Sequence, residues 1–504
     1  MGKQYRVVTL DGDFDFLQLA RTASRERRHT ALLYSPQDND PTHSEDTACW
    51  RLLGFDPILT FKSKGAFCEF SYENVTTRVF GNPWTIFESR FSQFEVLGGE
   101  EYDFPLGAAI GYFGYDMKNS VEPGLPQNAR DDLESYDCFV GFYTTLFVQK
   151  KLKNGRTLTK IVASGHDAHG NCHSTRADAN LEKAYSFISD IQKRDKDDCF
   201  SQPSEKSNPE KVETTLISRK SMKSSLTENG FINCVQKAKG WIKHGHIYQV
   251  NLSQRLSVEI GDIGFDGLDF FSKLLFQSSA NLGGYIQADS MELMSCSPEL
   301  FLSMKANRVM TSPIKGTRPR SSDPIQDQSN LDELMRSEKE KAELTMITDL
   351  LRNDIGKISK YGSVSVDQFL KHKALSHVHH MFSTITGSIK NNVSHLGVLR
   401  SCFPGGSITG APKVRAMEII DELEPVTRGP YTGSLGFLGF NQISQFNILI
   451  RSAHLSSGNL FYSVGAGIVA DSDPLMEYQE TWYKAKDFKK ALDEKKILGA
   501  DFQK

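Results

Sequence analysis

The sequence has 504 residues, of which 39% are hydrophobic, so it can build at least one large core and favours a globular chain of about two to four domains. Its 59 Lys and Arg residues nearly balance 62 Asp and Glu residues, which gives a net charge of −3. This balance leaves no basic field to hold a nucleic acid or an anionic membrane surface. The expected partners are therefore small molecules or another protein.

No segment typical of secretion or membrane insertion is expected. Met1–Leu10 lacks an apolar run of signal-peptide length, and no stretch of about 18 apolar residues occurs. We therefore expect a soluble, cytoplasmic protein. The eight cysteines are scattered and form no Cys-x-x-Cys pair, which disfavours a zinc knuckle or a redox motif and predicts reduced, mostly buried thiols.

The first part of the chain, residues 1–192, shows short strand patterns among loops. These patterns lie at Arg6–Leu10, Ala31–Tyr34 and Phe139–Gln149. A charged, Ser-rich stretch follows at residues 193–223 and contains two prolines. It predicts a flexible linker, because it has too little apolar surface to order itself. Residues 224–504 are then expected to form the catalytic domain.

Helical and extended patterns mix after the predicted linker, so the fold should combine α and β structure. Helices are predicted at Phe231–His244 and Glu333–Asn353, and strands at Gln249–Ser257, Tyr431–Phe440 and Phe446–Leu455. The stretch Ser456–Asn459 lies between two apolar runs and is typical of a hairpin turn. At least part of the sheet is therefore expected to be antiparallel.

One carboxylate falls on the apolar face of a predicted helix. Glu343 is in line with Ile347, Leu350 and Leu351, at spacings that place all four on one stripe. An ionised carboxylate that points inward is costly unless a cation or strong donors compensate it. The alternative is a glutamate at the rim of the stripe that reaches a nearby lysine.

Two further carboxylates share one face of a helix that is predicted to begin at the N-cap Asp473. On this helix Glu477, Glu480 and Lys484 lie together, at offsets of three and four. An exposed ion pair between Glu480 and Lys484 is one explanation. If Glu343 instead converges with Glu477 and Glu480, the hard oxygen ligands suit Mg²⁺.

Two glycine-rich segments could hold an anionic ligand. The stretch Phe403–Lys413 leads into a predicted helix, whose free backbone N–H groups suit a carboxylate or phosphate. Its glycine spacing approaches that of a nucleotide P-loop, but Ala411 stands where the lysine is needed, which argues against ATP. A tight loop that only caps the helix is the alternative. Small residues at Gly465–Gly467, after an apolar strand, would let a ligand approach the backbone.

An ordered set of motifs runs through the second part of the chain. The motifs are YQVNLSQR at Tyr248–Arg255, SPELF at Ser297–Phe301, PIKGTRPR at Pro313–Arg320, DLLRND at Asp349–Asp354, the glycine loop, RGPY at Arg428–Tyr431, IRSA at Ile450–Ala453 and the segment from Gly465 to Lys484. Together they resemble the chorismate-utilising enzymes: component I of anthranilate synthase and of aminodeoxychorismate synthase, with isochorismate and salicylate synthases as cousins. The resemblance covers about residues 231–504, and residues 1–192 match the N-terminal region of component I more loosely. It implies an α+β fold with two, mostly antiparallel, sheets and flanking helices.

The resemblance also implies site residues. Those that match Mg²⁺ ligands are Glu343, Glu477 and Glu480. Those that match positions holding chorismate are Gly316, Thr317, Tyr431, Arg451, Gly465, Ala466, Gly467 and Lys484, while Ser407 lines the same pocket. Those placed among the catalytic groups are Lys315, Glu299 and His380. Arg451 can grip a substrate carboxylate through two parallel hydrogen bonds, and Glu299 matches a proposed general acid or base.

Lys315 separates two branches of this resemblance. The anthranilate branch usually carries alanine in Pro-[Ile/Leu]-Ala-Gly-Thr, whereas the aminodeoxychorismate branch carries Pro-Ile-Lys-Gly-Thr, as this sequence does. In the second branch the lysine is proposed to attack the chorismate ring, and a nucleophilic amine is expected to be partly desolvated. Glu299 would protonate the departing hydroxyl and ammonia would replace it. The implied product is 4-amino-4-deoxychorismate, a precursor of 4-aminobenzoate and folate, without release of pyruvate.

The same resemblance has consequences for partners and regulation. No cysteine lies in the Gly-x-Cys-x-Gly setting of a glutaminase, so a separate glutaminase subunit is implied as the source of ammonia. Leu32–Ser35 and Ala280–Gly284 replace the two elements that form a tryptophan pocket in the anthranilate branch, so tryptophan feedback is not expected.

Two other functions remain open from the sequence. The first is anthranilate synthase component I, which would serve tryptophan biosynthesis. The second is a non-catalytic subunit that only binds a glutaminase. The retained set of Glu299, Lys315, Glu343, Arg451 and Glu480 disfavours the non-catalytic reading, because a chain without activity is free to lose such residues.

Overall fold

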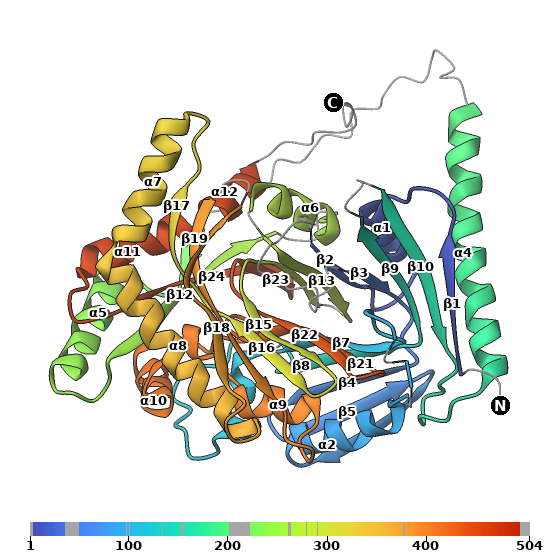
Figure 1. The fold of residues 1–504 in the computed structure, drawn as a ribbon, viewed down its shortest axis with the longest axis horizontal. Helices are drawn as coiled ribbons and strands as arrows, with labels where there is room; N and C mark the ends of the chain where they lie inside the picture. The colour runs from blue at the N-terminus through green and yellow to red at the C-terminus, as the bar shows by residue number, and fades with distance from the viewer. Residues whose placement is uncertain are drawn as a thin grey trace.

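The computed structural model describes residues 4–35, 50–96, 98–99, 101–133, 135–152, 156–200, 222–260, 264–278, 280–289, 291–375 and 378–493. In this part of the chain two twelve-stranded sheets occupy the centre, with helices around them (Figure 1). The strand pairs of both sheets are antiparallel, which confirms the expected α+β class. None of the helices in these ranges is long and apolar enough to cross a membrane.

The first sheet joins strands from both ends of the chain. Its order is β1 (Tyr5–Leu10), β10 (Thr157–Ser164), β9 (Thr145–Lys151), β3 (Arg51–Gly54), β2 (Ala31–Tyr34), β13 (Leu282–Ala288), β14 (Met291–Ser297), β23 (Ser452–Ser456), β24 (Asn459–Ile468), β12 (Gln249–Glu259) and β11 (Lys223–Ser224), with β20 (Gly410–Ala411) also on β12.

The second sheet is built in the same way. Its order is β17 (Ile314–Pro319), β19 (Val378–Ser388), β16 (Arg308–Ser312), β15 (Leu300–Lys305), β22 (Ile443–Ile448), β21 (Ser434–Gly439), β7 (Ala108–Phe113), β8 (Cys138–Tyr143), β4 (Leu59–Lys64), β5 (Phe67–Tyr72) and β6 (Val75–Phe80), with β18 (Ser365–Ala374) also on β19. Both sheets therefore contain strands from before residue 193 and after residue 223, so these two regions share one framework.

Helices flank the two sheets on their outer sides (Figure 1). They are α1 (Phe16–Glu26), α2 (Pro83–Phe91), α3 (Lys118–Val121), α4 (Ser174–Phe200), α5 (Glu228–Lys243), α6 (Gly267–Gln277), α7 (Pro324–Arg336), α8 (Glu338–Ile358), α9 (His395–Cys402), α10 (Lys413–Leu423), α11 (Pro474–Lys484) and α12 (Lys486–Asp493). Short 3-10 turns lie at η1 (Ser92–Phe94), η2 (Tyr115–Met117) and η3 (Gly406–Ile408). Local sequence fixes several starts. For example, the Asp473 carboxylate accepts from the backbone N–H groups of Leu475 and Met476, as expected for the predicted N-cap.

Alternating side chains divide the core between the two faces of the first sheet. Leu52 and Ile286 pack into the large cluster between the sheets, whereas Leu53 and Tyr285 pack into a second cluster with α1, α4 and α6. This is the two-residue period of a strand that is covered on both sides. A third cluster lies under α5, α10 and α11, against β12 and β24.

Two predicted strands turn out to be pairs of strands. Phe139–Gln149 is β8 of the second sheet followed, after Thr144, by β9 of the first sheet, and Phe446–Leu455 is likewise β22 followed by β23. An apolar run looks continuous in sequence even where the chain passes from one sheet to the other, because both halves are buried. The predicted hairpin at Ser456–Asn459 is confirmed, since it joins β23 to β24.

Two other boundaries differ from the predictions. The predicted helix Glu333–Asn353 is divided at Ser337, whose hydroxyl accepts from the backbone N–H of Glu340 and begins α8. The predicted linker at 193–223 begins too early, because α4 continues to Phe200. Most of that predicted linker lies outside the described residues.

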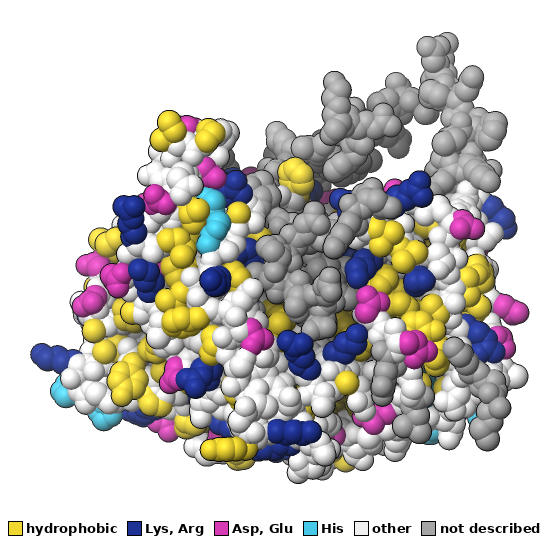
Figure 2. Space-filling model, in the orientation of Figure 1, with side chains coloured by type: hydrophobic (Ala, Val, Ile, Leu, Met, Phe, Trp, Pro, Cys, Tyr) yellow, Lys and Arg dark blue, Asp and Glu magenta, His cyan; other side chains and the backbone are white. Residues whose placement is uncertain are grey.

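Surface charges of both signs are mixed on the face that Figure 2 shows, in agreement with the balanced composition. The described cysteines are all free thiols, and those at Cys68, Cys138, Cys296 and Cys402 are buried. Burial raises the pKa of the Cys68 thiol to about 11 and that of Cys296 to about 12, so these thiols stay protonated. These free thiols agree with the expectation from the sequence.

We predict that Phe142→Ala destabilises the fold by about 3–5 kcal/mol, because it empties a fully buried site. The Phe142 ring contacts Phe87, Phe91 and Phe94, with centroid distances of 5.7, 6.4 and 4.7 Å. Chemical denaturation followed by fluorescence measures the effect. Phe276→Ala is the control, since Phe276 is 78% exposed and should change stability by less than about 0.5 kcal/mol. Equal losses in the two variants would contradict this description of the core.

Candidate active site

Lys315 lies on β17, the edge strand of the second sheet, opposite Met381 of β19. Its side chain is 20% exposed, and its Nζ atom lies 3.9 Å from Oε2 of Glu343. The amine is thus partly shielded from water and faces a carboxylate. The next residue, Gly316, has φ +72°, and a Cβ atom there would lie 2.6 Å from Cδ1 of Leu334, so the bend beside Lys315 requires glycine.

A strip of backbone without side chains, at Gly465 and Gly467 of β24, lies beside this lysine. A Cβ atom on Gly467 would lie 3.9 Å from the Nζ atom of Lys315 and 2.6 Å from Nε2 of Gln249. A Cβ atom on Gly465 would lie 2.9 Å from the hydroxyl oxygen of Tyr431. Because both positions lack a side chain, the Gln249 amide and the Tyr431 hydroxyl can pack directly against the strand, next to the amine of Lys315.

The two residues nearest to this strip behave differently. Ala466 points to the opposite face of β24 and is fully buried in the third cluster, so only its backbone can face a ligand. Lys484 of α11 donates from Nζ to the carbonyl oxygen of Gly465 at 2.9 Å. It also pairs with Glu480 at 2.7 Å, with side chains 40% and 46% exposed, which is the ion pair considered from the sequence.

Glu299 lies where the chain passes from β14 in the first sheet to β15 in the second. Glu299 is 7% exposed, and its backbone carbonyl oxygen accepts from the backbone N–H of Ile448 at 3.1 Å. Burial raises the pKa of its carboxyl group, although the Ser407 hydroxyl and the charge of Lys315 oppose the shift. A carboxyl group that keeps its proton to a higher pH can act as a general acid.

His380 lies on β19, opposite Thr317 of β17, and its imidazole is buried and neutral. Its Nδ1 atom lies 3.0 Å from the Thr317 hydroxyl and 3.3 Å from the carbonyl oxygen of Gly316. Burial, with the charge of Arg451 in support, lowers the pKa of the imidazole to about 4. Nε2 of His380 is buried and has no hydrogen-bond partner within the described ranges, so this atom remains available to a ligand.

Arg451 occupies the other passage between the sheets, from β22 to β23, and has φ +51°. A non-glycine residue held in this region is strained, which is common at functional sites. No carboxylate pairs with its guanidinium in the part of the chain that the structure describes, so the guanidinium can bind a carboxylate group of a substrate. Nearby, burial raises the pKa of the Tyr431 hydroxyl, which therefore remains a hydrogen-bond donor.

Four carboxylates form two matching pairs, Glu340 and Glu343 on α8 and Glu477 and Glu480 on α11. Burial and the charge of Glu343 raise the pKa of Glu340. Burial and the charge of Glu480 raise the pKa of Glu477, against a hydrogen bond of 2.6 Å from the Ser472 hydroxyl. Sequence reasoning missed Glu340. The available signal was the spacing, because the two glutamates on each helix lie three residues apart in the sequence.

The expected convergence of Glu343, Glu477 and Glu480 is not a preformed metal cluster. Among the described residues no three His, Cys, Asp or Glu side chains are arranged as a ready site for a metal ion. Lysines compensate the acids instead, Lys315 beside Glu343 and Lys484 beside Glu480. The donor set nevertheless consists of carboxylate oxygens alone, which fits Mg²⁺ better than Zn²⁺.

Gln249 was also missed from the sequence. It is the first residue of β12 and is 2% exposed. Its Oε1 atom is buried and lacks a hydrogen-bond partner in the described ranges. An unpaired amide beside Lys315 and Gly467 points to a polar ligand. Its position at the head of the YQVNLSQR motif was the available signal.

A buried ion pair holds the walls of the site together. Arg428 donates to Glu424 at 2.9 and 2.7 Å, and both side chains are at most 5% exposed. The same guanidinium donates to the carbonyl oxygens of Ile408 in the glycine loop and Asn251 in β12. Glu424 also accepts from the backbone N–H and the hydroxyl of Ser253. One pair thus joins the glycine loop, β12 and the turn before Tyr431.

The glycine loop does not lead directly into a helix as predicted. The turn η3 and the short strand β20 come first, and the backbone N-cap of α10 is Pro412. The amine of Lys413 at the start of α10 is bound by Asp354 and by the carbonyl oxygen of Cys402. The contact between Ser407 and Glu299 places the loop beside the candidate acid, while anion binding by the loop stays a prediction.

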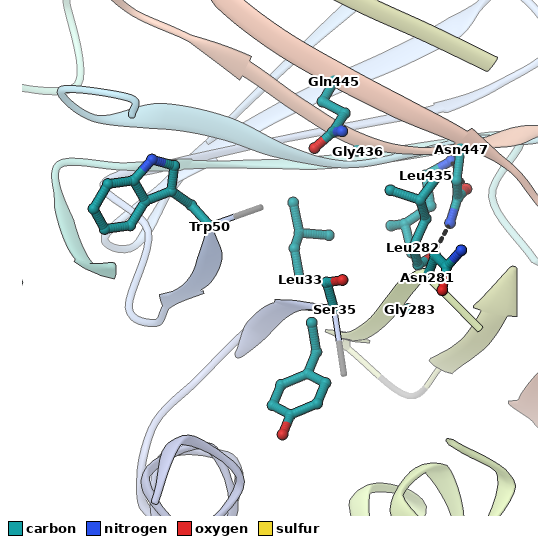
Figure 3. Close-up of a pocket in the computed structure, with 11 residues that line it drawn as sticks. Leu33, Ser35, Trp50, Asn281, Leu282, Gly283, Leu435, Gly436, Gln445 and Asn447 are labelled. Atoms are coloured by element: carbon teal, nitrogen blue, oxygen red, sulfur yellow. Dashed lines mark hydrogen bonds between the residues drawn. The ribbon is translucent and has the colours of Figure 1, made fainter. Parts of the chain in front are cut away.

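The two segments that differ from the tryptophan-binding elements of the anthranilate branch lie side by side. Tyr34 pairs with Gly283 across β2 and β13. Figure 3 shows that side chains from these strands and from β21 and β22 line one pocket. Asn447 donates to the carbonyl oxygen of Leu282 at 2.8 Å at one side of it. The expected absence of tryptophan feedback stays a prediction.

Comparison with known proteins agrees with this geometry. The chain is 33% identical over 479 residues to aminodeoxychorismate synthase component 1 of Bacillus subtilis, covering 95% of this chain and 94% of that protein. It is 34% identical over 453 residues to anthranilate synthase component 1 of Acetivibrio thermocellus, covering 89% and 88%. The crystal structure of anthranilate synthase component I from Streptococcus pneumoniae TIGR4 has a TM-score of 0.70 and 27% identity, covering 87% and 91%.

The two-sheet fold and a site of lysine, arginine and paired carboxylates thus define a chorismate-utilising enzyme. Residues 43–490 match the chorismate binding enzyme family, and the chain belongs to it. The resemblance seen in the sequence is therefore confirmed. Relatives with the two names occur at similar identity, so similarity alone does not separate the two reactions.

We predict that Arg428→Met destabilises the protein by about 3–5 kcal/mol, because it leaves the Glu424 carboxylate buried without its cation. Urea denaturation measures the loss. Arg415→Met is the matched control, since Arg415 pairs with Glu418 on the surface of α10, with side chains 36% and 35% exposed. That pair should contribute less than about 1 kcal/mol. A wild-type midpoint for Arg428→Met would contradict the structural role of the buried pair.

Proposed function

We propose that this chain is the component I subunit of an aminodeoxychorismate synthase, which aminates chorismate to 4-amino-4-deoxychorismate. The observation that carries the proposal is the amine of Lys315, which lies 3.9 Å from Glu343 and beside the backbone of Gly467. A lysine at this point supplies a nucleophile within the candidate substrate site. The motif Pro-Ile-Lys-Gly-Thr around this lysine supports the aminodeoxychorismate branch, while similarity to known proteins supports only the family.

The proposed reaction has two displacement steps. In the first, the neutral amine of Lys315 forms a bond to the chorismate ring while the ring C–OH bond breaks, and Glu299 transfers its proton to the departing oxygen to give water. In the second, ammonia forms a bond to the carbon that lost the hydroxyl, while the bond to Lys315 breaks. The lysine is released unchanged, and the enolpyruvyl group stays on the product.

The remaining residues are assigned to binding and orientation. Arg451 takes a carboxylate of chorismate, for which its guanidinium has no competitor in the described ranges. The Tyr431 hydroxyl lies beside the backbone of Gly465 and would donate a hydrogen bond to chorismate. The neutral imidazole of His380 supports β17 through Thr317 and presents Nε2 to the site.

Mg²⁺ is proposed as the cofactor. The carboxylates that would hold it are Glu340, Glu343, Glu477 and Glu480. When bound, the ion would neutralise a second carboxylate of chorismate. We also propose that a separate glutaminase subunit supplies ammonia, as the component naming of the relatives suggests for those proteins.

Product analysis tests the proposed reaction. The purified chain, given Mg²⁺, chorismate and an ammonium salt at raised pH, should form aminodeoxychorismate without pyruvate. Chromatography with mass detection, together with a coupled pyruvate assay, measures both outcomes. Release of pyruvate with fluorescent anthranilate would instead assign the chain to the anthranilate reaction, and no turnover at all would favour a non-catalytic subunit.

The raised pKa of Glu299 predicts a pH dependence. Its protonated form is the acid, and because burial raises its pKa this form persists to a higher pH than in an ordinary glutamate. The rate per free ammonia should therefore fall as the pH rises through the raised pKa. Glu299→Gln should lower the rate by about 10²–10⁴-fold and remove that fall.

Glu292→Gln is the matched control for this pH profile. Burial also raises the pKa of Glu292, but its carboxylate accepts from the Tyr285 hydroxyl at 2.9 Å. This variant should keep the wild-type profile. A Glu299→Gln enzyme with wild-type rate and pH dependence would exclude Glu299 as the general acid.

A further inference from the structure

Lys339 is an exposed lysine of α8 that lies beside the acidic pair of Glu340 and Glu343. It precedes Glu340 on α8, and its Nζ atom lies 4.0 Å from Oε1 of Glu343, one helical turn on. The other oxygen of the same carboxylate, Oε2, faces the amine of Lys315 at 3.9 Å. Glu343 therefore lies between two lysine side chains, one from its own helix and one from β17.

The charge of Lys339 also reaches the other three carboxylates. Burial raises the pKa of Glu340 and of Glu477, and Lys339 opposes the shift in both. In Glu480 burial favours a higher pKa, but the charge and the hydrogen bond of Lys484, with the charges of Lys339 and Lys315, together lower it. Beside its ion pair with Glu343, Lys339 thus acts electrostatically on carboxylates of both helices.

Lys339 is also the cation of this group that can leave most easily. Its side chain is 56% exposed, and Glu343 is its ion-pair partner in the described part of the chain. By contrast, Lys484 is tied to a backbone carbonyl of β24, and Lys315 is only 20% exposed. A flexible lysine stem can carry its ammonium group into water without moving the helix.

We propose that Lys339 is a resident counter-cation, which pairs with Glu343 and reduces the negative charge of the acidic pairs until a divalent ion displaces it, and which thereby tunes the affinity of the site for that ion. This inference rests on the metal site of the proposed function. Two cations that compete for the same carboxylates repel each other at short range, so the ion must displace the ammonium group as it enters. Removing the lysine should leave Glu343 with one cation fewer and strengthen divalent binding.

The test is a titration of the full chain with Mn²⁺, without chorismate or ammonia and at constant ionic strength, with free Mn²⁺ measured by electron paramagnetic resonance. Lys339→Met should bind Mn²⁺ on the order of three- to tenfold more tightly than wild type, as expected for one lost charge near a half-exposed site. Lys339→Gln should behave in the same way. Lys339→Arg keeps the charge and should stay close to wild type.

Lys341→Met is the matched control, because it removes the same charge from the same helix. Lys341 pairs with Glu338 at 2.9 Å, away from the acidic pairs, so Mn²⁺ affinity should not change. Unchanged or weaker binding in both neutral Lys339 variants would overturn the inference. An equal gain in Lys341→Met, or no Mn²⁺ binding by wild type, would overturn it as well. Product identity plays no part in this readout, so the proposed reaction stands or falls separately.

Discussion

The buried pair of Arg428 and Glu424 is the interaction on which the rest of the site depends. It joins the glycine loop at Ile408 to β12 at Asn251 and fixes the turn that carries Tyr431. A buried ion pair is stable only when its remaining donors and acceptors are satisfied, and here backbone groups of separate segments satisfy them. Because the pair needs these hydrogen bonds, it fixes the spacing between the glycine loop and β12, which form two walls of the site.

Charge balance is the second constraint. Nearby cations balance the carboxylates on α8 and α11, and the amine of Lys315 is part of that balance. These cations are Lys315 and Lys339 at Glu343, Arg318 at Glu340 and Lys484 at Glu480. Burial raises the pKa of the nearby acid Glu299, and the charge of Lys315 opposes this shift. The site thus brings together an amine, a carboxylate beside it and a buried acid, which are the groups that the proposed displacement at a ring carbon needs.

Local signals predicted much of the fold, including the N-cap at Asp473 and the hairpin at Ser456–Asn459. The sequence could not show where strands pass between sheets, because apolar residues continue across Thr144 and across Arg451. Motifs predicted most of the site, while Glu340 was missed because a partly buried glutamate near a helix start resembles an ordinary surface residue. Which face Ala466 occupies also depends on register, which only the paired strands define.

The central claim is that the amine of Lys315 carries out the first displacement. The most direct measurement compares chorismate consumption by Lys315→Ala with wild type, at saturating Mg²⁺ and ammonia, after circular dichroism has shown that both are folded. Lys371→Ala, which removes an exposed lysine from β18, is the control. The account predicts that Lys315→Ala loses most of its turnover while the control keeps it. Wild-type turnover in Lys315→Ala would contradict the account.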